Sequence, residues 1–216
     1  MSEFANRRAA RLTNWTDKVG LLLRDAPQIE SKLFVGRRAE LQQLLSILGP
    51  NEQPASQQKV VLGGMGGVGK TQLAIAYAKQ YQHLYDSVLW LNATSEALLR
   101  DSIRSVALMF EESGNVSAYD DAPILAFFSR WLSQQGNTRW LLILDNYDNP
   151  ELYDIRRFLP VRSQGSIIIT TRLTGEVAER CACPIIHLQP LTSVGEALKV
   201  LATRSGREIH DSGRTL

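Results

Sequence analysis

The sequence predicts an α/β fold built around a parallel sheet of five strands. Apolar segments of strand length alternate with helical segments along most of the chain, which is typical of this fold class. Two of the segments, "WLLILD" (140–145) and "SIIITT" (166–171), are almost uninterrupted apolar runs, as expected when helices cover both faces of a parallel sheet. A glycine-rich turn separates the first strand from the helix that follows it.

The expected elements cover the chain from end to end. Strands are expected at 59–63, 87–93, 140–145, 166–171 and 184–188. Helices are expected at 8–26, around Leu41–Leu48, at 70–82 and 95–110, around Ile124–Leu132, and at 193–206. The polar, proline-containing segment "GPNEQPASQQ" (49–58) is expected to be a loop.

Composition and charge exclude several classes of protein. The 216 residues include 44% apolar and 21% charged residues, which are ordinary values for a globular protein. The net charge is +2, and the lysines and arginines are spread along the chain, so the sequence shows no electrostatic footprint for nucleic acid. No apolar run approaches the roughly 18 residues of a membrane span, and the N-terminus lacks a hydrophobic signal core. We therefore expect a cytoplasmic protein with neither a nucleic-acid nor a membrane partner.

The cysteines and histidines give little indication of a metal site. Cys181 and Cys183 form a C-x-C pair without a second pair of ligands, which is a poor zinc site. Two buried thiols are the favoured interpretation, and a metal or redox role is the alternative. His83, His187 and His210 are isolated in the sequence, and we expect packing roles for them.

The glycine-rich turn has the spacing of a phosphate-binding loop. Residues 64–71, "GMGGVGKT", fit the pattern G-x-x-x-x-G-K-[ST] between a strand and a helix. Glycines permit positive φ angles, and backbone N–H groups and the helix N-terminus can then surround an anion. Lys70 is expected to reach the β- and γ-phosphates of a nucleotide, and Thr71 to ligate Mg²⁺. A tight turn that binds nothing is the alternative. The expected nucleotide-binding residues here are Gly64, Met65, Gly66, Gly67, Val68, Gly69, Lys70, Thr71 and Gln72.

Two further residues end apolar strands. Asp145 follows "LLIL" and is expected at the carboxyl edge of the sheet, where it would complete the Mg²⁺ site; capping of the next turn is the alternative. Arg172 ends "GSIIITTR" and would contact a γ-phosphate if its strand lies beside the phosphate-loop strand. A solvated surface arginine is the alternative. We expect Asp145 and Arg172 to be the catalytic residues.

Together, these stretches resemble the NB-ARC nucleotide-binding domain of the STAND class of signalling ATPases, which includes plant disease-resistance proteins and NOD-like receptors. "GGMGGVGKTQLA" resembles its Walker A motif, "LLILDN" its Walker B motif and "GSIIITTR" its sensor strand. "LFVGRRAEL" (33–41) is similar to the element that contacts adenine, so the resemblance implies that role for Val35, Gly36 and Arg37. It also implies a P-loop NTPase fold with strand order 5-1-4-3-2. The implied boundaries are an N-terminal helix and linker at 1–32, the NB-ARC domain at 33–191, and the start of a helical subdomain at 192–216.

The sequence departs from the family pattern in two ways. Many relatives have two consecutive acids after the Walker B strand, but here position 146 is Asn and the nearest other acid is Asp148. An amide is a poor proton acceptor, so slow ATP hydrolysis is expected. The family's G-L-P-L motif and winged-helix domain do not appear, and we therefore expect a fragment of a longer receptor.

The resemblance implies an ADP/ATP-binding module that works as a signalling switch and self-associates in its full-length, ATP-bound form. Two alternatives remain open at this stage. One is an active P-loop ATPase or phosphotransferase, and the other is a non-catalytic scaffold that nucleotide merely stabilises.

Overall fold

A computed structural model of the chain describes residues 26–27, 36–49, 57–110, 121–134, 137–160 and 164–191. The expected helices at 8–26 (apart from Ala26) and 193–206, His210 and Val35 lie outside the described residues. The proposed boundaries at residues 32 and 191 therefore stay predictions.

Five parallel strands form one sheet, as the sequence predicts. The strands are β1 (Gln58–Gly63), β2 (Ser87–Asn92), β3 (Trp140–Asp145), β4 (Ser166–Thr171) and β5 (Ile185–His187). Their order across the sheet is β2-β3-β4-β1-β5, which confirms the order 5-1-4-3-2. The central strand β4 pairs with β3 on one side and with β1 on the other. The condition set for Arg172 is therefore met, because its strand lies beside the strand that leads into the glycine-rich loop.

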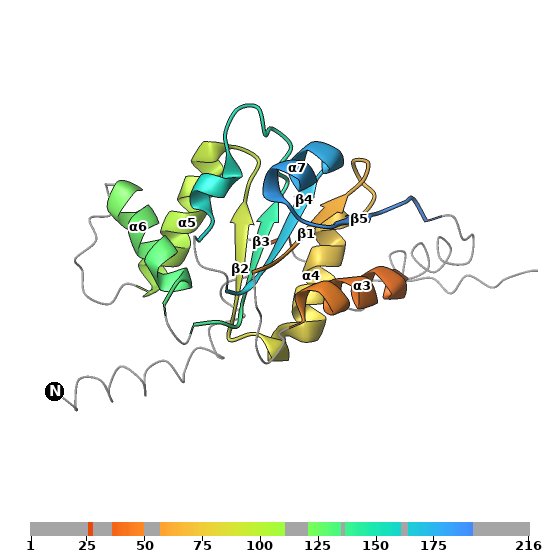
Figure 1. Cartoon of the computed structure of the whole chain (residues 1–216), viewed down its shortest axis with the longest axis horizontal. Helices are drawn as coiled ribbons and strands as arrows, with labels where there is room; N and C mark the ends of the chain where they lie inside the picture. Colours follow the sequence, from red (N-terminus) through yellow and green to blue (C-terminus); the bar gives the residue numbers. More distant parts are fainter. Residues whose placement is uncertain are drawn as a thin grey trace, which may run out of the picture.

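Helices cover both faces of this sheet (Figure 1). One face packs against α3 (Arg38–Leu48) and α4 (Lys70–Tyr81), and the other packs against α5 (Glu96–Phe110), α6 (Asp121–Leu132) and α7 (Thr174–Cys181). Two short 3-10 turns, η3 (Gln82–Leu84) and η4 (Ile155–Phe158), lie in the connections. Among the described helices, none has both the length and the hydrophobicity that crossing a bilayer requires.

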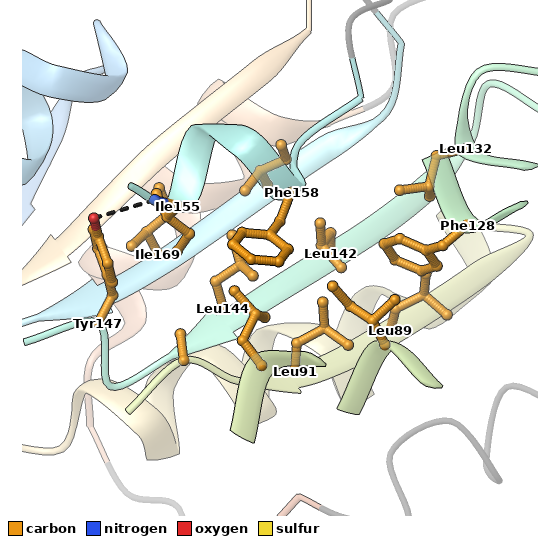
Figure 2. Close-up of a cluster of buried hydrophobic side chains, with 14 of the residues drawn as sticks. Leu89, Leu91, Phe128, Leu132, Leu142, Leu144, Tyr147, Ile155, Phe158 and Ile169 are labelled. Carbon is orange, nitrogen blue, oxygen red and sulfur yellow. Dashed lines mark hydrogen bonds between the residues drawn. The ribbon is translucent and has the colours of Figure 1, made fainter. Parts of the chain in front are cut away.

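Alternation along each strand divides the core into two layers. In β3, Leu142 and Leu144 face the layer under α5 and α6, whereas Leu141 and Ile143 face the layer under α3 and α4, and all four are fully buried. Figure 2 shows the first layer, where Phe158 from η4 lies over the strands and the hydroxyl of Tyr147 accepts a hydrogen bond from the N–H of Ile155. Burial on both faces explains why the strands are apolar runs rather than alternating patterns.

Two details differ from the expectation. Helix α7 was not predicted, although Val177, Ala178 and Cys181 bury one of its faces. Cys181 is buried as expected, but Cys183 is only partly buried, because it follows the end of α7, where the chain turns toward β5. Both thiols are free, and the described residues contain no group of three His, Cys, Asp or Glu side chains that could hold a metal ion.

Candidate functional site

The glycine-rich loop between β1 and α4 depends on three glycines with positive φ. Gly64, Gly67 and Gly69 have φ angles of 140°, 77° and 100°. A Cβ on Gly64 would lie 2.6 Å from the carbonyl oxygen of Leu188, so this position needs glycine for close packing as well. A Cβ on Gly67 or Gly69 would meet nothing within 4 Å. The middle of the loop therefore presents bare backbone to open space, at the N-terminus of α4, which is the arrangement that phosphate binding requires.

Lys70, the first residue of α4, turns its side chain back into this loop. Its ammonium group donates hydrogen bonds to the carbonyl oxygens of Gly64 (2.7 Å) and Met65 (3.0 Å), and the residue is buried. Burial lowers the pKa of Lys70, and the nearby Asp148 and Asp145 carboxylates partly offset this effect. The amine is thus already held inside the loop by weak neutral acceptors that phosphate oxygens can replace.

Three oxygen-bearing side chains from α4, β3 and β4 meet beside the loop. The hydroxyls of Thr71 and Thr170 both donate to the same oxygen of Asp145, Oδ1, at 2.8 Å and 2.6 Å. The Thr170 hydroxyl also accepts the backbone N–H of Asn146 at 2.8 Å, which fixes its direction. Burial raises the pKa of Asp145, while the two hydroxyls and Lys70 act in the opposite direction. A carboxylate and a hydroxyl are ligands that Mg²⁺ prefers, so the predicted pair Thr71 and Asp145 fits a magnesium site.

Arg172 follows β4 at the same edge of the sheet. Its Nε lies 2.5 Å from Oδ2 of Asp148, and its side chain is 61% exposed, whereas that of Asp148 is only 5% exposed. Arg172 is therefore exposed, as the alternative of a solvated surface arginine predicts, but its side chain is also paired with a buried carboxylate.

One cavity of about 520 Å³, a size typical of small-ligand sites, lies over the loop beside Lys70, Thr71 and Arg172. Its described lining is Pro27, Gly66, Gly67, Gly69, Lys70, Thr71, Gln72, Asn146, Thr170 and Arg172. A neighbouring cavity of about 500 Å³ shares Pro27, Thr71 and Asn146 with it and adds Asp145. Most of the predicted loop residues, together with Asp145 and Arg172, are thus brought together. Met65 is 73% exposed and, with Gly64 and Val68, does not line either cavity.

Gly36 and Arg37 immediately precede α3, and Arg37 contacts the loop at Val68. The Arg37 guanidinium donates to the carbonyl oxygens of Val68 (3.2 Å) and Gln189 (2.6 Å) and pairs with Glu40 (2.8 Å). Arg37 has a left-handed backbone with φ of 59°, an uncommon conformation for a residue other than glycine. It joins α3 to the loop and to the end of β5.

Sequence reasoning did not anticipate two contacts. If β4 lies beside β1, Thr170 and Thr171 are expected to emerge with Arg172 next to the γ-phosphate, but the hydrogen bond from Thr170 to Asp145 follows only from the pairing of β3 with β4. Asp148 was noticed as the nearest other acid, but its contact with Arg172 was not anticipated.

With this geometry established, comparison with known proteins identifies the family. The model of the NB-ARC domain family matches residues 37–205. The chain belongs to the NB-ARC family. It is 30% identical over 190 residues to a nucleotide-binding leucine-rich repeat (NLR)-like protein of Hyaloscypha variabilis, an alignment that covers 81% of this chain and 19% of that protein. It is 28% identical over 183 residues to the putative disease resistance RPP13-like protein 3 of Arabidopsis thaliana, with 80% of this chain and 21% of that protein covered. This NB-ARC chain thus spans about a fifth of the length of these relatives.

Solved structures support the fold of this NB-ARC domain. A STAND protein with a tetratricopeptide repeat sensor from Pyrococcus horikoshii superposes with a TM-score of 0.52 at 21% identity, covering 85% of this chain and 27% of that one. The Cdc6 protein of Pyrobaculum aerophilum gives a TM-score of 0.56 at 15% identity, covering 82% and 54%. At these identities the likeness concerns the fold alone. The family match, together with this fold, makes the chain an NB-ARC nucleotide-binding module.

Proposed function

We propose that this NB-ARC domain binds ADP or ATP with Mg²⁺ over the glycine-rich loop and works as a nucleotide-dependent switch with slow ATP hydrolysis. The observation that supports this proposal is the convergence of Lys70, the Thr71–Asp145 pair and Arg172 around one loop at the carboxyl edge of the sheet. Open α/β sheets bind their ligands at this edge.

Each group has a separate task in the proposed site. The loop N–H groups and Lys70 bind the β-phosphate, which ADP and ATP share, and Lys70 also reaches the γ-phosphate. Thr71 and Asp145 hold Mg²⁺, which neutralises phosphate charge. Arg172 contacts the γ-phosphate, which only ATP has. A ligand shifts a conformational equilibrium only through contacts that differ between states, so Arg172 and the metal ligands are the groups on which switching depends.

The structure supports slow hydrolysis through its shortage of proton acceptors. Within the described lining of the cavity over the loop there is no carboxylate, and Asp145, which lines the neighbouring cavity, is assigned to Mg²⁺ in this proposal. Asn146, at the position after Asp145, is an amide whose Nδ2 donates to Thr94 Oγ1 at 3.0 Å. Both oxygens of Asp148 accept hydrogen bonds from Arg172. General-base catalysis would contribute about 10²–10⁴-fold to the rate, and a site without a base at the attacking water forgoes it.

Lys70→Ala tests the nucleotide assignment. At a hundredfold excess over Kd, nucleotide should stabilise the native protein by about 3 kcal/mol, a rise in melting temperature of about 6–12 °C. We expect Lys70→Ala to abolish this rise for both nucleotides, and Lys79→Ala, in the last turn of the same helix, to retain it. Thermal unfolding with ADP or ATP, with and without Mg²⁺, measures the effect. A full rise in Lys70→Ala would remove the phosphate-loop assignment.

The two alternatives have their own outcomes in the same experiments. Steady turnover well above about one ATP per minute would favour an active ATPase. Equal stabilisation by ADP and ATP, with no change in association state, would favour a nucleotide-stabilised scaffold. Self-association of the ATP-bound form belongs to the full-length protein and is part of this proposal.

A further inference from the structure

Asp148 is a buried acid placed between the ends of two neighbouring strands. It lies in the connection that leaves β3, and its side chain is 5% exposed. Oδ1 accepts the backbone N–H of Arg172 at 2.7 Å and the hydroxyl of Thr171 at 3.3 Å, and Oδ2 accepts Nε of Arg172 at 2.5 Å. Asp148 therefore holds both the backbone and the side chain of Arg172.

This contact uses only one side of the guanidinium. Arginine has five N–H donors, and the bond to Oδ2 occupies the single donor on Nε. In the part of the chain that the structure describes, no acceptor pairs with the two outer nitrogens of Arg172. The side chain lines the cavity over the loop, and a Cβ on Gly66 would lie 4.0 Å from its Cδ. The two outer nitrogens of Arg172 are thus held at the cavity, in the geometry that suits bidentate contact with phosphate oxygens.

We propose that Asp148 is a positioning residue that fixes Arg172 at the cavity and thereby sets the preference of this domain for ATP over ADP. The inference rests on the proposed function, and it assigns to one acid the discrimination between the two nucleotide states. A flexible arginine would have to lose its rotamer freedom on binding the γ-phosphate, whereas Asp148 imposes that order beforehand.

Two simpler roles for Asp148 make different predictions. If the acid only shapes the loop after β3, its removal would lower stability without changing the ratio of the two affinities. If Asp148 acts through Lys70, whose pKa its charge raises, its removal would weaken the binding of ADP and ATP alike. Only a role through Arg172 affects ATP selectively.

Asp148→Asn separates these roles. The asparagine keeps an oxygen for the backbone N–H of Arg172 but places an NH₂ donor opposite the Nε donor, so it releases the side chain and spares the loop. We expect Kd for ATP to rise about threefold to tenfold, and Kd for ADP to change less than about twofold. Asp154→Asn is the matched control, because Asp154 lies in the same β3–β4 connection and pairs with Arg156. Isothermal titration with ATP and ADP in Mg²⁺ measures both constants.

The double variant shows whether Asp148 acts through Arg172. Arg172→Ala should lower the ATP-to-ADP affinity ratio about tenfold or more. In that background, adding Asp148→Asn should change the ratio by less than about 1.5-fold, because the residue it positions is gone. Arg172→Lys, which keeps the charge without the fork, should lose most of the ATP preference, and it tests the same geometry if Asp148→Asn fails to fold.

Several results would overturn the inference while leaving the proposed function intact. These are an unchanged ratio in Asp148→Asn, additive effects in the double variant, or full ATP preference in Arg172→Lys, each in a protein whose nucleotide binding still requires Lys70. Binding that survives Lys70→Ala, or a wild type that binds neither nucleotide, would overturn the proposed function itself and the inference with it.

Discussion

Replacing Asp145 with Asn should stabilise the nucleotide-free protein while weakening its Mg²⁺-dependent binding. The asparagine keeps the oxygen that accepts the Thr71 and Thr170 hydroxyls, so the change removes mainly the charge. Burial raises the pKa of Asp145 against the combined effect of two hydroxyl donors and Lys70. The ionised carboxylate therefore costs the native state free energy at neutral pH, and the neutral amide avoids that cost.

The sign and size of the effect follow from proton linkage. Because the pKa of Asp145 is higher in the native state than its unfolded value of about 3.9, the native protein binds more protons between the two values. The stability of the wild type should thus fall as pH rises through that interval and then level off. Asp145→Asn lacks this slope. Its advantage should be near zero below about pH 4 and should reach, at pH 7, about 1.4 kcal/mol for each unit by which the native pKa exceeds the unfolded one. Each kcal/mol corresponds to a rise in melting temperature of about 2–4 °C.

Thermal unfolding of both proteins between pH 4 and pH 8 in EDTA measures this advantage. With Mg²⁺ and ATP the order should reverse, because the wild type gains the metal contact that the amide weakens. A variant that is less stable than the wild type at pH 7 in EDTA would refute the reasoning. It would mean that the hydrogen bonds to the carboxylate outweigh the cost of burying it.

Two further substitutions test the packing of the sheet and the support of the loop. Gly165→Ala should cost about 3 kcal/mol in unfolding experiments, because Gly165 has φ of 72° and a Cβ there would lie 2.2 Å from the buried ring of Trp140. Gly175→Ala, whose Cβ would meet nothing within 4 Å, is its control and should be near neutral. Arg37→Ala should weaken the binding of ADP and of GDP about equally, by roughly tenfold, because the Val68 carbonyl in the loop loses its hydrogen-bond partner. Arg38→Ala, which changes an exposed neighbour of Arg37, should leave both affinities unchanged. A loss confined to adenine nucleotides would instead support the adenine contact that the family resemblance implies.

The strands were predictable from the sequence because they are apolar runs, and the main site residues because they lie at the ends of those runs. A strand buried on both faces must be largely apolar. Asp145 ends one such strand and Arg172 directly follows another, where a parallel sheet presents its ligand-binding edge. The order of the strands was different, since apolar runs contain no information about pairing, and only the resemblance implied it. Helix α7 was missed because its eight residues are fewer than a helical pattern needs to be recognised, and Gly175 near its start lowers its helix propensity.

The contact between Asp148 and Arg172 could not have been predicted in the same way. Its direction depends on the turn after β3, where Asn146 takes a left-handed backbone with φ of 66°. Asparagine is enriched in that conformation, but its presence does not require it. The role of Arg37 likewise depends on the fold, which brings Gln189 from the end of β5 beside the loop.

Once the contacts of the site are considered together, they divide into two kinds. Lys70 donates hydrogen bonds to Gly64 and Met65, and Thr71 donates one to Asp145. Phosphate and Mg²⁺ must therefore replace these contacts within the protein when they bind. Arg172 binds Asp148 through Nε, and a γ-phosphate can add to its outer nitrogens while that bond stays. The reorganisation cost of binding therefore falls on the part of the site that ADP and ATP share. In the proposed site, the arginine that distinguishes ATP from ADP is held before either nucleotide binds. We therefore expect ATP selectivity to respond to Asp148 and overall affinity to respond to the loop.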